Sequence, residues 1–201
     1  MFDLLFKYYQ PTSVIDVGCG IGDLLSEALR RGMRVKGVDG PWWSGADIHI
    51  PKEFHEIHDL NEPYSCEARY DLATTIEVGE HLKKPRSKGF VQDLCALSDY
   101  VLFSAAIPGQ KGNGHINNRW QGEWAELFAE EGYRCYDPFR RRLFDYENIQ
   151  PWYKRNLLFY VRDGAPVSEL LQEHEIPPAA ASYKTADQHD RVVRCFRNKL
   201  K

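Results

Sequence analysis

Residues 13–22 read SVIDVGCGIG, a compact apolar run that leads directly into three glycines at alternate positions. Glycine lets the backbone turn tightly between a strand and a helix, and it lets a ligand approach main-chain amides closely. Apolar residues at 24, 25, 28 and 29 then recur at helical spacing until Arg31-Gly32, a typical helix stop. The stretch therefore predicts a strand, a ligand-facing glycine turn and a helix, in that order.

The same alternation continues along the chain. Further strands are expected at 33–38, 54–58, 70–76 and 100–106, helices at 2–9, 85–97 and 119–131, and a final antiparallel pair at 133–136 and 156–161. Strands that alternate with helices predict a doubly wound, Rossmann-like α/β fold, with a seven-stranded, mostly parallel sheet and helices on both faces. We expect this domain to cover residues 1–163. Residues 164–201 would form an extension that is packed on the domain or trails from it.

Composition narrows the classes of partner and compartment. The 201 residues carry a net charge of −3, whereas nucleic-acid binders usually have a basic surplus, so nucleic acid is disfavoured as a partner. No run of 18 apolar residues exists, so no membrane span is expected. The five cysteines are scattered without CxxC pairs, which is typical of reduced thiols in a cytoplasmic protein.

Carboxylates end the first three predicted strands. Asp16 precedes the glycine turn, where it suits an amine-bearing ligand better than a pyrophosphate, which it would repel. Asp39, about 20 residues on, is placed to accept both hydroxyls of a ribose. Asp59 could meet an adenine amine and Leu60 could cover the ring, while Trp42 could stack on the adenine or simply pack. A turn that serves packing only, or a nicotinamide dehydrogenase, would not explain these features together.

Four segments carry a family resemblance. VIDVGCGIGDLL, GVDG, HDL and YDLATTIEVGEHL occur in the order of the motifs of class I S-adenosylmethionine-dependent methyltransferases, and the chain resembles that family over roughly residues 10–160. The resemblance implies S-adenosylmethionine as the cofactor. It places the methionine portion at Asp16, Gly18 and Gly20, the ribose at Asp39, the adenine at Asp59, and the sulfonium near Thr75 and Ile76.

A candidate metal site follows the fourth predicted strand. Glu77, Glu80 and His81 share one face of a helical turn at i, i+3 and i+4, and His115 lies on the loop after the next strand. Two oxygen and two nitrogen ligands suit magnesium or manganese and leave about two coordination positions open. Such an ion would lower the pKa of an acceptor hydroxyl. Without metal, His81 or His115 is a candidate general base, and Glu80 could be a local hydrogen-bonding or capping group.

The Glu-x-x-Glu-His pattern resembles two metal-using branches of the superfamily, the small-RNA terminal 2′-O-methyltransferases and the ubiquinone-pathway O-methyltransferases. The chain departs from the RNA enzymes because one histidine follows Glu80 where they have two in a row, and because their basic extensions are missing. This departure puts an RNA acceptor in doubt.

A polar loop supplies candidate acceptor contacts. Residues 108–120 resemble the substrate loop of methyltransferases found with polysaccharide and glycan assembly enzymes, and Asn117, Arg119 and Trp120 are residue types that grip sugars. Arg119 and Trp120 could equally begin the next helix. The run Arg140-Arg141-Arg142 could bind a phosphate or form a solvated face.

These observations predict an O-methyltransferase that acts on a sugar hydroxyl of a glycan or glycoside with help from a divalent metal, and they leave open that the chain is part of a larger glycan-assembly protein. The alternatives are an RNA 2′-O-methyltransferase, a small-molecule O-methyltransferase acting on a quinone or phenol, and a cofactor-binding module without catalysis.

Overall fold

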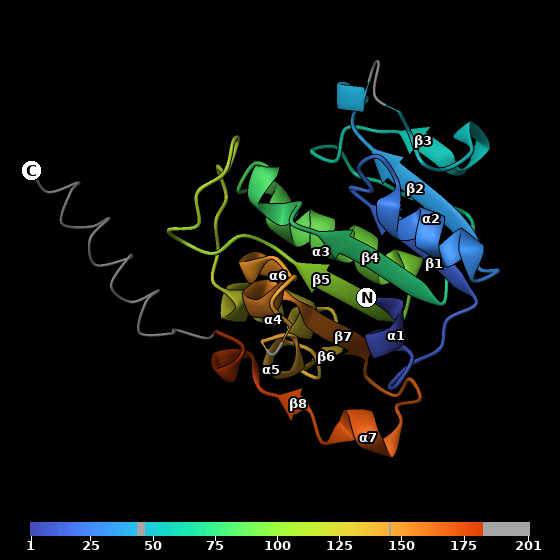
Figure 1. Cartoon of the computed structure of the whole chain (residues 1–201). Coiled ribbons are helices and arrows are strands. Elements are labelled where there is room, and N and C mark those ends of the chain that lie inside the picture. Colours follow the sequence, from blue (N-terminus) through green and yellow to red (C-terminus); the bar gives the residue numbers. More distant parts are fainter. Residues whose placement is uncertain (44–46, 145, 183–201) are drawn as a thin grey trace, which may run out of the picture.

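The computed structural model describes residues 1–43, 47–144 and 146–182 (Figure 1). Its centre is one sheet with the strand order β3-β2-β1-β4-β5-β7-β6-β8. The strands are β1 (Ser13–Val17), β2 (Arg34–Asp39), β3 (His55–Ile57), β4 (Leu72–Ile76), β5 (Tyr100–Ser104), β6 (Tyr133–Tyr136), β7 (Leu158–Arg162) and β8 (Glu175–Ile176). Strands β1 to β5 pair in parallel, whereas β7 is antiparallel to both β5 and β6. The predicted doubly wound α/β fold is confirmed.

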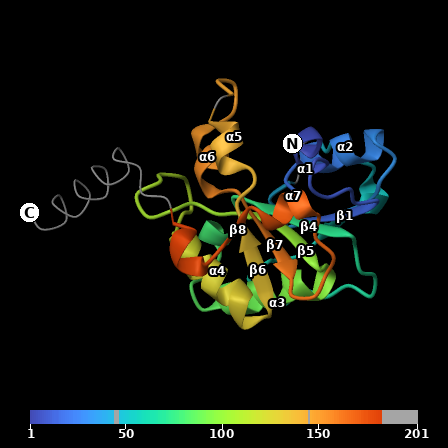
Figure 2. The ribbon, with the colours of Figure 1, turned by 90° about the horizontal axis from the view of Figure 1, so that it is seen from below.

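Helices cover both faces of the sheet (Figure 2). One face packs against α1 (Phe2–Leu5), α2 (Asp23–Arg30), α5 (Arg140–Leu143) and α7 (Glu169–Gln172), and the other against α3 (Arg86–Leu97) and α4 (Gln121–Glu130). A further helix, α6 (Pro151–Asn156), lies beside α5 and β5. Every residue of β1 and β5 is buried, as two-sided coverage of a parallel sheet requires.

The order of the strands positions the site. Strand β1 lies between β2 and β4, so the chain reverses direction across the sheet at this point. In open α/β sheets ligands bind at such a switch point, outside the carboxyl ends of the strands. The turn after β1 is held there because the amides of Gly18 and Cys19 both donate to the Val38 carbonyl of β2, at 2.7 and 3.2 Å.

The sheet differs from the prediction in having eight strands instead of seven. The eighth, β8, pairs antiparallel with β6 and comes from the predicted extension, so residues 164–182 continue the sheet, while residues 183–201 lie outside the described residues. Arg140 was expected on a solvated or phosphate-binding run. It is instead fully buried and pairs with Asp137 at 2.8 Å. Among the residues that the structure describes, no helix is both long and apolar enough to cross a membrane.

Candidate functional site

A cavity of about 670 Å³ opens beside the glycine turn. Four of the residues predicted to bind the cofactor line it, and so do three residues from other parts of the chain. They are Asp16, Gly18, Gly20 and Ile76, with Met1, Phe2 and Tyr153. The turn requires glycine because Gly18, Gly20 and Gly22 all have positive φ, a conformation that side chains disfavour. The cavity is therefore the site where the methionine portion of the cofactor is expected.

Asp16 is buried at the end of β1, with 4% of its surface exposed. Its Oδ1 accepts a hydrogen bond of 2.6 Å from the Thr74 hydroxyl. Burial raises the pKa of the Asp16 carboxyl to about 7; the Thr74 hydrogen bond opposes this rise and the neighbouring Asp39 carboxylate adds to it. A cationic ligand group would favour the ionised form of this carboxyl.

This pKa predicts that cofactor affinity depends on pH. About one Asp16 carboxyl in ten is ionised at pH 6 and about nine in ten at pH 8, since the pKa is about 7. The affinity for S-adenosylhomocysteine, which carries the same amino group, should therefore rise about tenfold over this range in calorimetry. The ligand-free protein should show the opposite trend in thermal unfolding, because ionising a buried carboxyl lowers the free energy of unfolding. Asp16→Asn should remove both trends, and their persistence in this variant would assign them to another group.

Asp39 ends β2 beside the same turn. Its Oδ2 accepts from the amide of Gly20 at 2.8 Å, and its Oδ1 accepts from the amide of Gly40 at 2.6 Å. The indole N–H of Trp42 also donates to Oδ1, at 3.1 Å. The carboxylate predicted to accept ribose hydroxyls is therefore held by two amides, and Trp42 occupies one of its oxygens.

Trp42 is expected to compete with the cofactor for Asp39. A ribose hydroxyl that bonds to Oδ1 must displace the indole N–H, and Trp42 is free to move because 68% of its surface is exposed. Trp42→Phe keeps a ring but removes the donor, so the affinity for S-adenosylhomocysteine should rise about twofold to tenfold. Fluorescence of the protein, which has five tryptophans, should change on binding in the wild type and less in the variant. Equal affinities and equal changes would show that the indole does not leave Asp39.

The other predicted cofactor residues have different environments. Asp59 is exposed, and its Oδ1 accepts from the amide and the side chain of Asn61 at 3.0 and 3.2 Å. Leu60 and Thr75 are both buried, and Leu60 belongs to the core. Thr75 is fully buried and its hydroxyl has no hydrogen-bond partner, whereas Ile76, the last residue of β4, lines the cavity. Of the pair proposed near the sulfonium, Ile76 is the one that faces open space.

Glu80, His81 and His115 form a compact cluster beyond the carboxyl end of β4. One carboxylate oxygen and one nitrogen from each imidazole lie within 4.8 Å of one another. The two rings are perpendicular with centroids 5.0 Å apart, and His115 Nε2 lies 3.9 Å from Glu80 Oε1. The loop is fixed to the turn after β4, because the amides of Ile116 and Asn117 both donate to the Glu80 carbonyl at 2.9 Å. The main chain itself thus brings His115 to Glu80.

Glu77 does not join this cluster. It was predicted to share a helical face with Glu80 and His81, but its φ is 57°, in the left-handed region, and the short helix begins only at Gly79. Its carboxylate accepts from Gln110 Nε2 at 2.7 Å and from Asn156 Nδ2 at 3.1 Å. Glu77 therefore ties the end of β4 to the β5 loop and to α6, and the expected four-ligand set is reduced to three.

The cluster fits a divalent cation. Glu80 is fully buried and neither of its carboxylate oxygens has a hydrogen-bond partner. Burial raises the pKa of Glu80 to about 8 and the charge of Glu77 adds to the rise; the nearby backbone amides of Glu80 and Ala106 oppose it, although their geometry falls short of a hydrogen bond. Burial also lowers the pKa of His81, and so does the neighbouring His115, so His81 is neutral near pH 7. An unpartnered buried carboxylate beside two imidazole nitrogens is a donor set that a divalent ion would complete.

The three predicted acceptor residues serve the protein's own structure. Asn117 is fully buried, and its amide donates to the Gly79 carbonyl and the Ser87 hydroxyl, both at 2.9 Å. Arg119 bonds to Asn117 and to Glu123, while Trp120 is the N-cap residue of α4. The prediction that these three residues bind a sugar is wrong for Asn117, because its side chain is fully buried. For Arg119 and Trp120 the structure agrees with the alternative that they begin a helix.

Sequence reasoning missed three residues that shape the site. Gln110 and Asn156 hold Glu77, and Tyr153 lines the cofactor cavity from α6. Asn156 was predicted to begin a strand, whereas it is the last residue of α6. Pro151 was the available signal, because proline is favoured at the first position of a helix.

Comparison with known proteins agrees with this geometry. The family model described as a methyltransferase domain matches residues 3–138, which is more than half of the chain. The ubiquinone biosynthesis O-methyltransferase of Coxiella burnetii is 40% identical over 83 residues, covering 36% of this chain and 34% of that protein. The chain thus spans about a third of the length of the curated relatives it matches.

Solved structures share the fold at low sequence identity. Magnesium protoporphyrin IX methyltransferase from Synechocystis PCC 6803, with bound SAM, has a TM-score of 0.52 and 18% identity, over 74% of this chain and 69% of that one. The small RNA methyltransferase HEN1 has a TM-score of 0.58 and 15% identity, over 81% and 25% of the two chains. With the family match and the cavity at the glycine turn, the chain belongs to the methyltransferase domain family, as an S-adenosylmethionine-dependent methyltransferase domain.

Proposed function

We propose that this chain is an O-methyltransferase that moves the methyl group of S-adenosylmethionine to a hydroxyl of a small molecule, assisted by a divalent ion at Glu80, His81 and His115. One observation carries the proposal. The Glu80 carboxylate is fully buried without a hydrogen-bond partner and lies within 4.8 Å of two imidazole nitrogens. Burying a carboxylate without a hydrogen-bond partner lowers the stability of the fold. Groups that carry such a cost are typical of functional sites.

The residues of the cluster would prepare the acceptor oxygen. Methyl transfer is a displacement at carbon, so it needs an oxygen nucleophile held in line with the methyl group. Manganese or magnesium, when bound by Glu80, His81 and His115, would lower the pKa of the acceptor hydroxyl. In the absence of a metal, His81, whose pKa is lowered by burial, would instead take the hydroxyl proton. The hydrogen bonds of Glu77 with Gln110 and Asn156 would hold the end of β4, and with it Ile76, in position next to the reacting groups.

The structure favours a small-molecule acceptor over the sugar predicted from the sequence. The sugar prediction rested on Asn117, Arg119 and Trp120, and these side chains are engaged within the protein. An RNA acceptor has no support from the net charge of −3. The partial sequence match to a ubiquinone-pathway O-methyltransferase is consistent with the small-molecule alternative.

The test is transfer of a labelled methyl group from S-adenosylmethionine to catechol, with methyl glucoside as the sugar comparison. We expect catechol to be methylated, the activity to be lost after treatment with EDTA, and manganese or magnesium to restore it. Activity that survives EDTA would overturn the role of the metal. Methylation of the glucoside and not of the catechol would restore the sugar prediction.

A further inference from the structure

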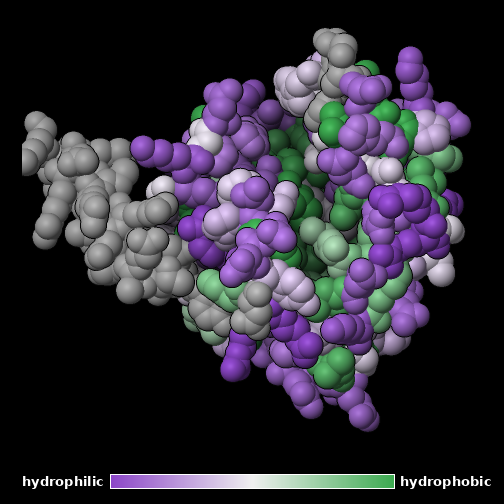
Figure 3. All heavy atoms as spheres, in the orientation of Figure 1, coloured by the Kyte–Doolittle hydropathy of each residue, from purple (hydrophilic) through white to green (hydrophobic). Residues whose placement is uncertain are grey.

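A second cavity, of about 430 Å³, adjoins the cofactor cavity. Met1 and Tyr153 line both of them, so the two spaces share a wall. In the space-filling view a hollow with hydrophobic side chains on its walls opens in the middle of the molecule (Figure 3). The second cavity thus lies next to the place where the methyl donor is expected.

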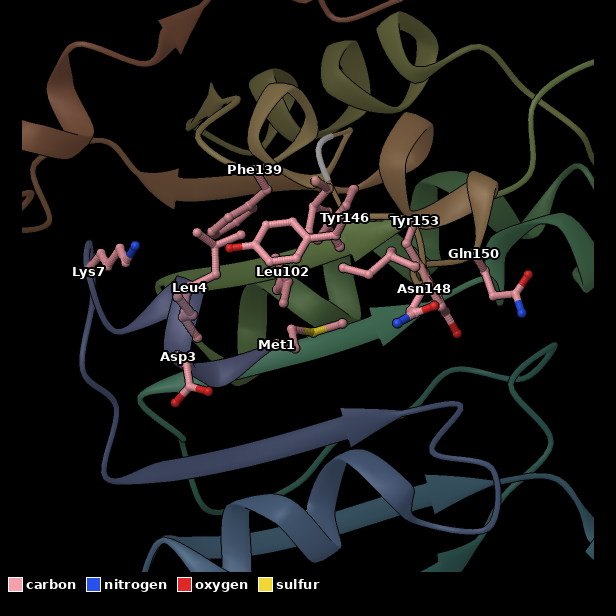
Figure 4. A pocket seen from close by; sticks show the side chains of 14 residues that line it. Met1, Asp3, Leu4, Lys7, Leu102, Phe139, Tyr146, Asn148, Gln150 and Tyr153 are labelled. Carbon is pink, nitrogen blue, oxygen red and sulfur yellow. The ribbon is translucent and has the colours of Figure 1, made fainter.

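The walls of this second cavity are mainly apolar. They come from α1, from β5 and from the segments 139–144 and 146–157; Leu4, Leu102 and Phe139 lie around one space, whereas Asp3, Lys7 and Gln150 lie at its edge (Figure 4). The apolar lining residues are Met1, Leu4, Leu5, Leu102, Phe139, Leu143, Ile149 and Leu157, with Tyr146 and Tyr153. Asp3 and Lys7 are the charged residues among those that line it.

The wall formed by α6 is fixed relative to the catalytic cluster. Tyr153 and Asn156 belong to the same short helix, and Asn156 Nδ2 donates to Glu77 Oε1 at 3.1 Å and to Gln110 Oε1 at 3.0 Å. Glu77 lies three residues before Glu80. A molecule that fills the cavity is therefore held against a wall that is bonded directly to the end of β4.

We propose that this cavity receives the apolar body of the acceptor, so that the substrate class is a phenol or hydroxylated ring bearing an aliphatic or aromatic substituent. The inference rests on the proposed function, because it names the acceptor of the same site. Polar groups of the lining are confined to a few side chains such as Asn148 and Gln150, so a sugar in this cavity would place most of its hydroxyls against apolar atoms, at a cost that apolar groups do not incur. An alkyl or aryl group would instead gain from leaving water.

The experiment measures acceptor binding and turnover with catechols that carry 4-methyl, 4-butyl and 4-octyl chains. Calorimetry on protein loaded with S-adenosylhomocysteine gives the affinity, and the methyl-transfer assay gives kcat/KM. Each methylene that enters the cavity should raise the affinity about threefold to fourfold until the space is filled. An affinity that does not change with chain length would overturn the inference.

Variants of the lining localise the effect. Leu4→Asp and Ile149→Asp place a charge on the apolar wall, at two residues that line the second cavity and not the cofactor cavity. Both should remove the dependence on chain length and leave the affinity for S-adenosylhomocysteine unchanged. Leu170→Asp is the matched control, because Leu170 is 42% exposed on α7 and lines neither cavity.

The outcomes separate the two proposals. If S-adenosylhomocysteine binds and catechol is methylated, but Leu4→Asp and Ile149→Asp keep the full chain-length dependence, the apolar body lies elsewhere and only the present inference fails. If catechol is not methylated at all, the proposed function fails. Loss of the dependence in both lining variants, with Leu170→Asp behaving as wild type, is the result we expect.

Discussion

Glu80→Gln is expected to lower the rate of methyl transfer by about 100-fold to 10,000-fold, the usual range for a group that assists proton removal from a nucleophile. Glutamine keeps the shape of the side chain but cannot carry the negative charge that a cation requires. The variant should therefore also lose its response to manganese. Stopped assays with EDTA-treated protein, across a manganese titration, measure both effects.

Loss of folding should not explain this result. Because burial and Glu77 raise the pKa of Glu80 to about 8, the metal-free protein at pH 7 already holds this side chain mainly in its neutral form, which glutamine imitates. Thermal unfolding of the metal-free variant should thus match that of the wild type. Glu126→Gln is the control, since Glu126 is exposed on α4 and lies outside the cluster, and it should keep the manganese response. A Glu80→Gln enzyme with normal turnover would contradict the assignment of the cluster.

Gly18→Ala is expected to abolish detectable cofactor binding and to destabilise the domain by about 2–5 kcal/mol. Two effects add. The φ of +85° at Gly18 is unfavourable for alanine, and a Cβ there would lie 2.2 Å from Val78 Cγ2. Val78 belongs to the turn between β4 and the catalytic cluster, so a clash that displaces it would disturb both halves of the site. Calorimetry with S-adenosylhomocysteine and thermal unfolding give the two readouts.

Gly32→Ala separates backbone strain from packing. Gly32 has a similar φ of +78°, but no atom lies within 4 Å of the position its Cβ would take. The free energy of unfolding of Gly32→Ala should fall only by the cost of the left-handed backbone conformation for alanine, about 1–2 kcal/mol, and the variant should bind the cofactor normally. If the two variants behaved alike, the close contact between Gly18 and Val78 would have no role in the site.

The regular part of the fold was predictable because its signals are local and repeated. The run from Ser13 to Gly22 combines a β-branched strand, glycines and a helical repeat, and β1, the turn and α2 follow it closely. Strand β8 has two residues, too few for any period to show, and it exists only because it pairs with β6. The buried Arg140 was missed for a similar reason, since its partners Asp137 and the Ala181 carbonyl are brought to it by the tertiary fold.

The part of the candidate site that depends only on where residues lie along the strands was predictable from the sequence. Asp16, Asp39, Glu80 and His115 follow the carboxyl ends of neighbouring strands, and this rule alone brings them to one edge of the sheet. The direction of each side chain was not predictable. Glu77 turns toward Gln110 and Asn156 because its backbone is left-handed, and Asn117 turns inward to bond with Gly79. Neither the second cavity nor its apolar wall leaves a periodic signal, because α1, β5 and α6 contribute to it from distant parts of the chain.

The central claim is that carboxylates at the ends of neighbouring strands bind the sulfonium nucleoside, and isothermal titration of S-adenosylhomocysteine into the wild type and into Asp39→Ala tests it most directly. The account predicts a single site in the wild type and an affinity at least about 100-fold weaker in Asp39→Ala, since two hydrogen bonds from ribose hydroxyls to a charged group are lost. No heat of binding in the wild type, or an unchanged affinity in Asp39→Ala, would contradict it.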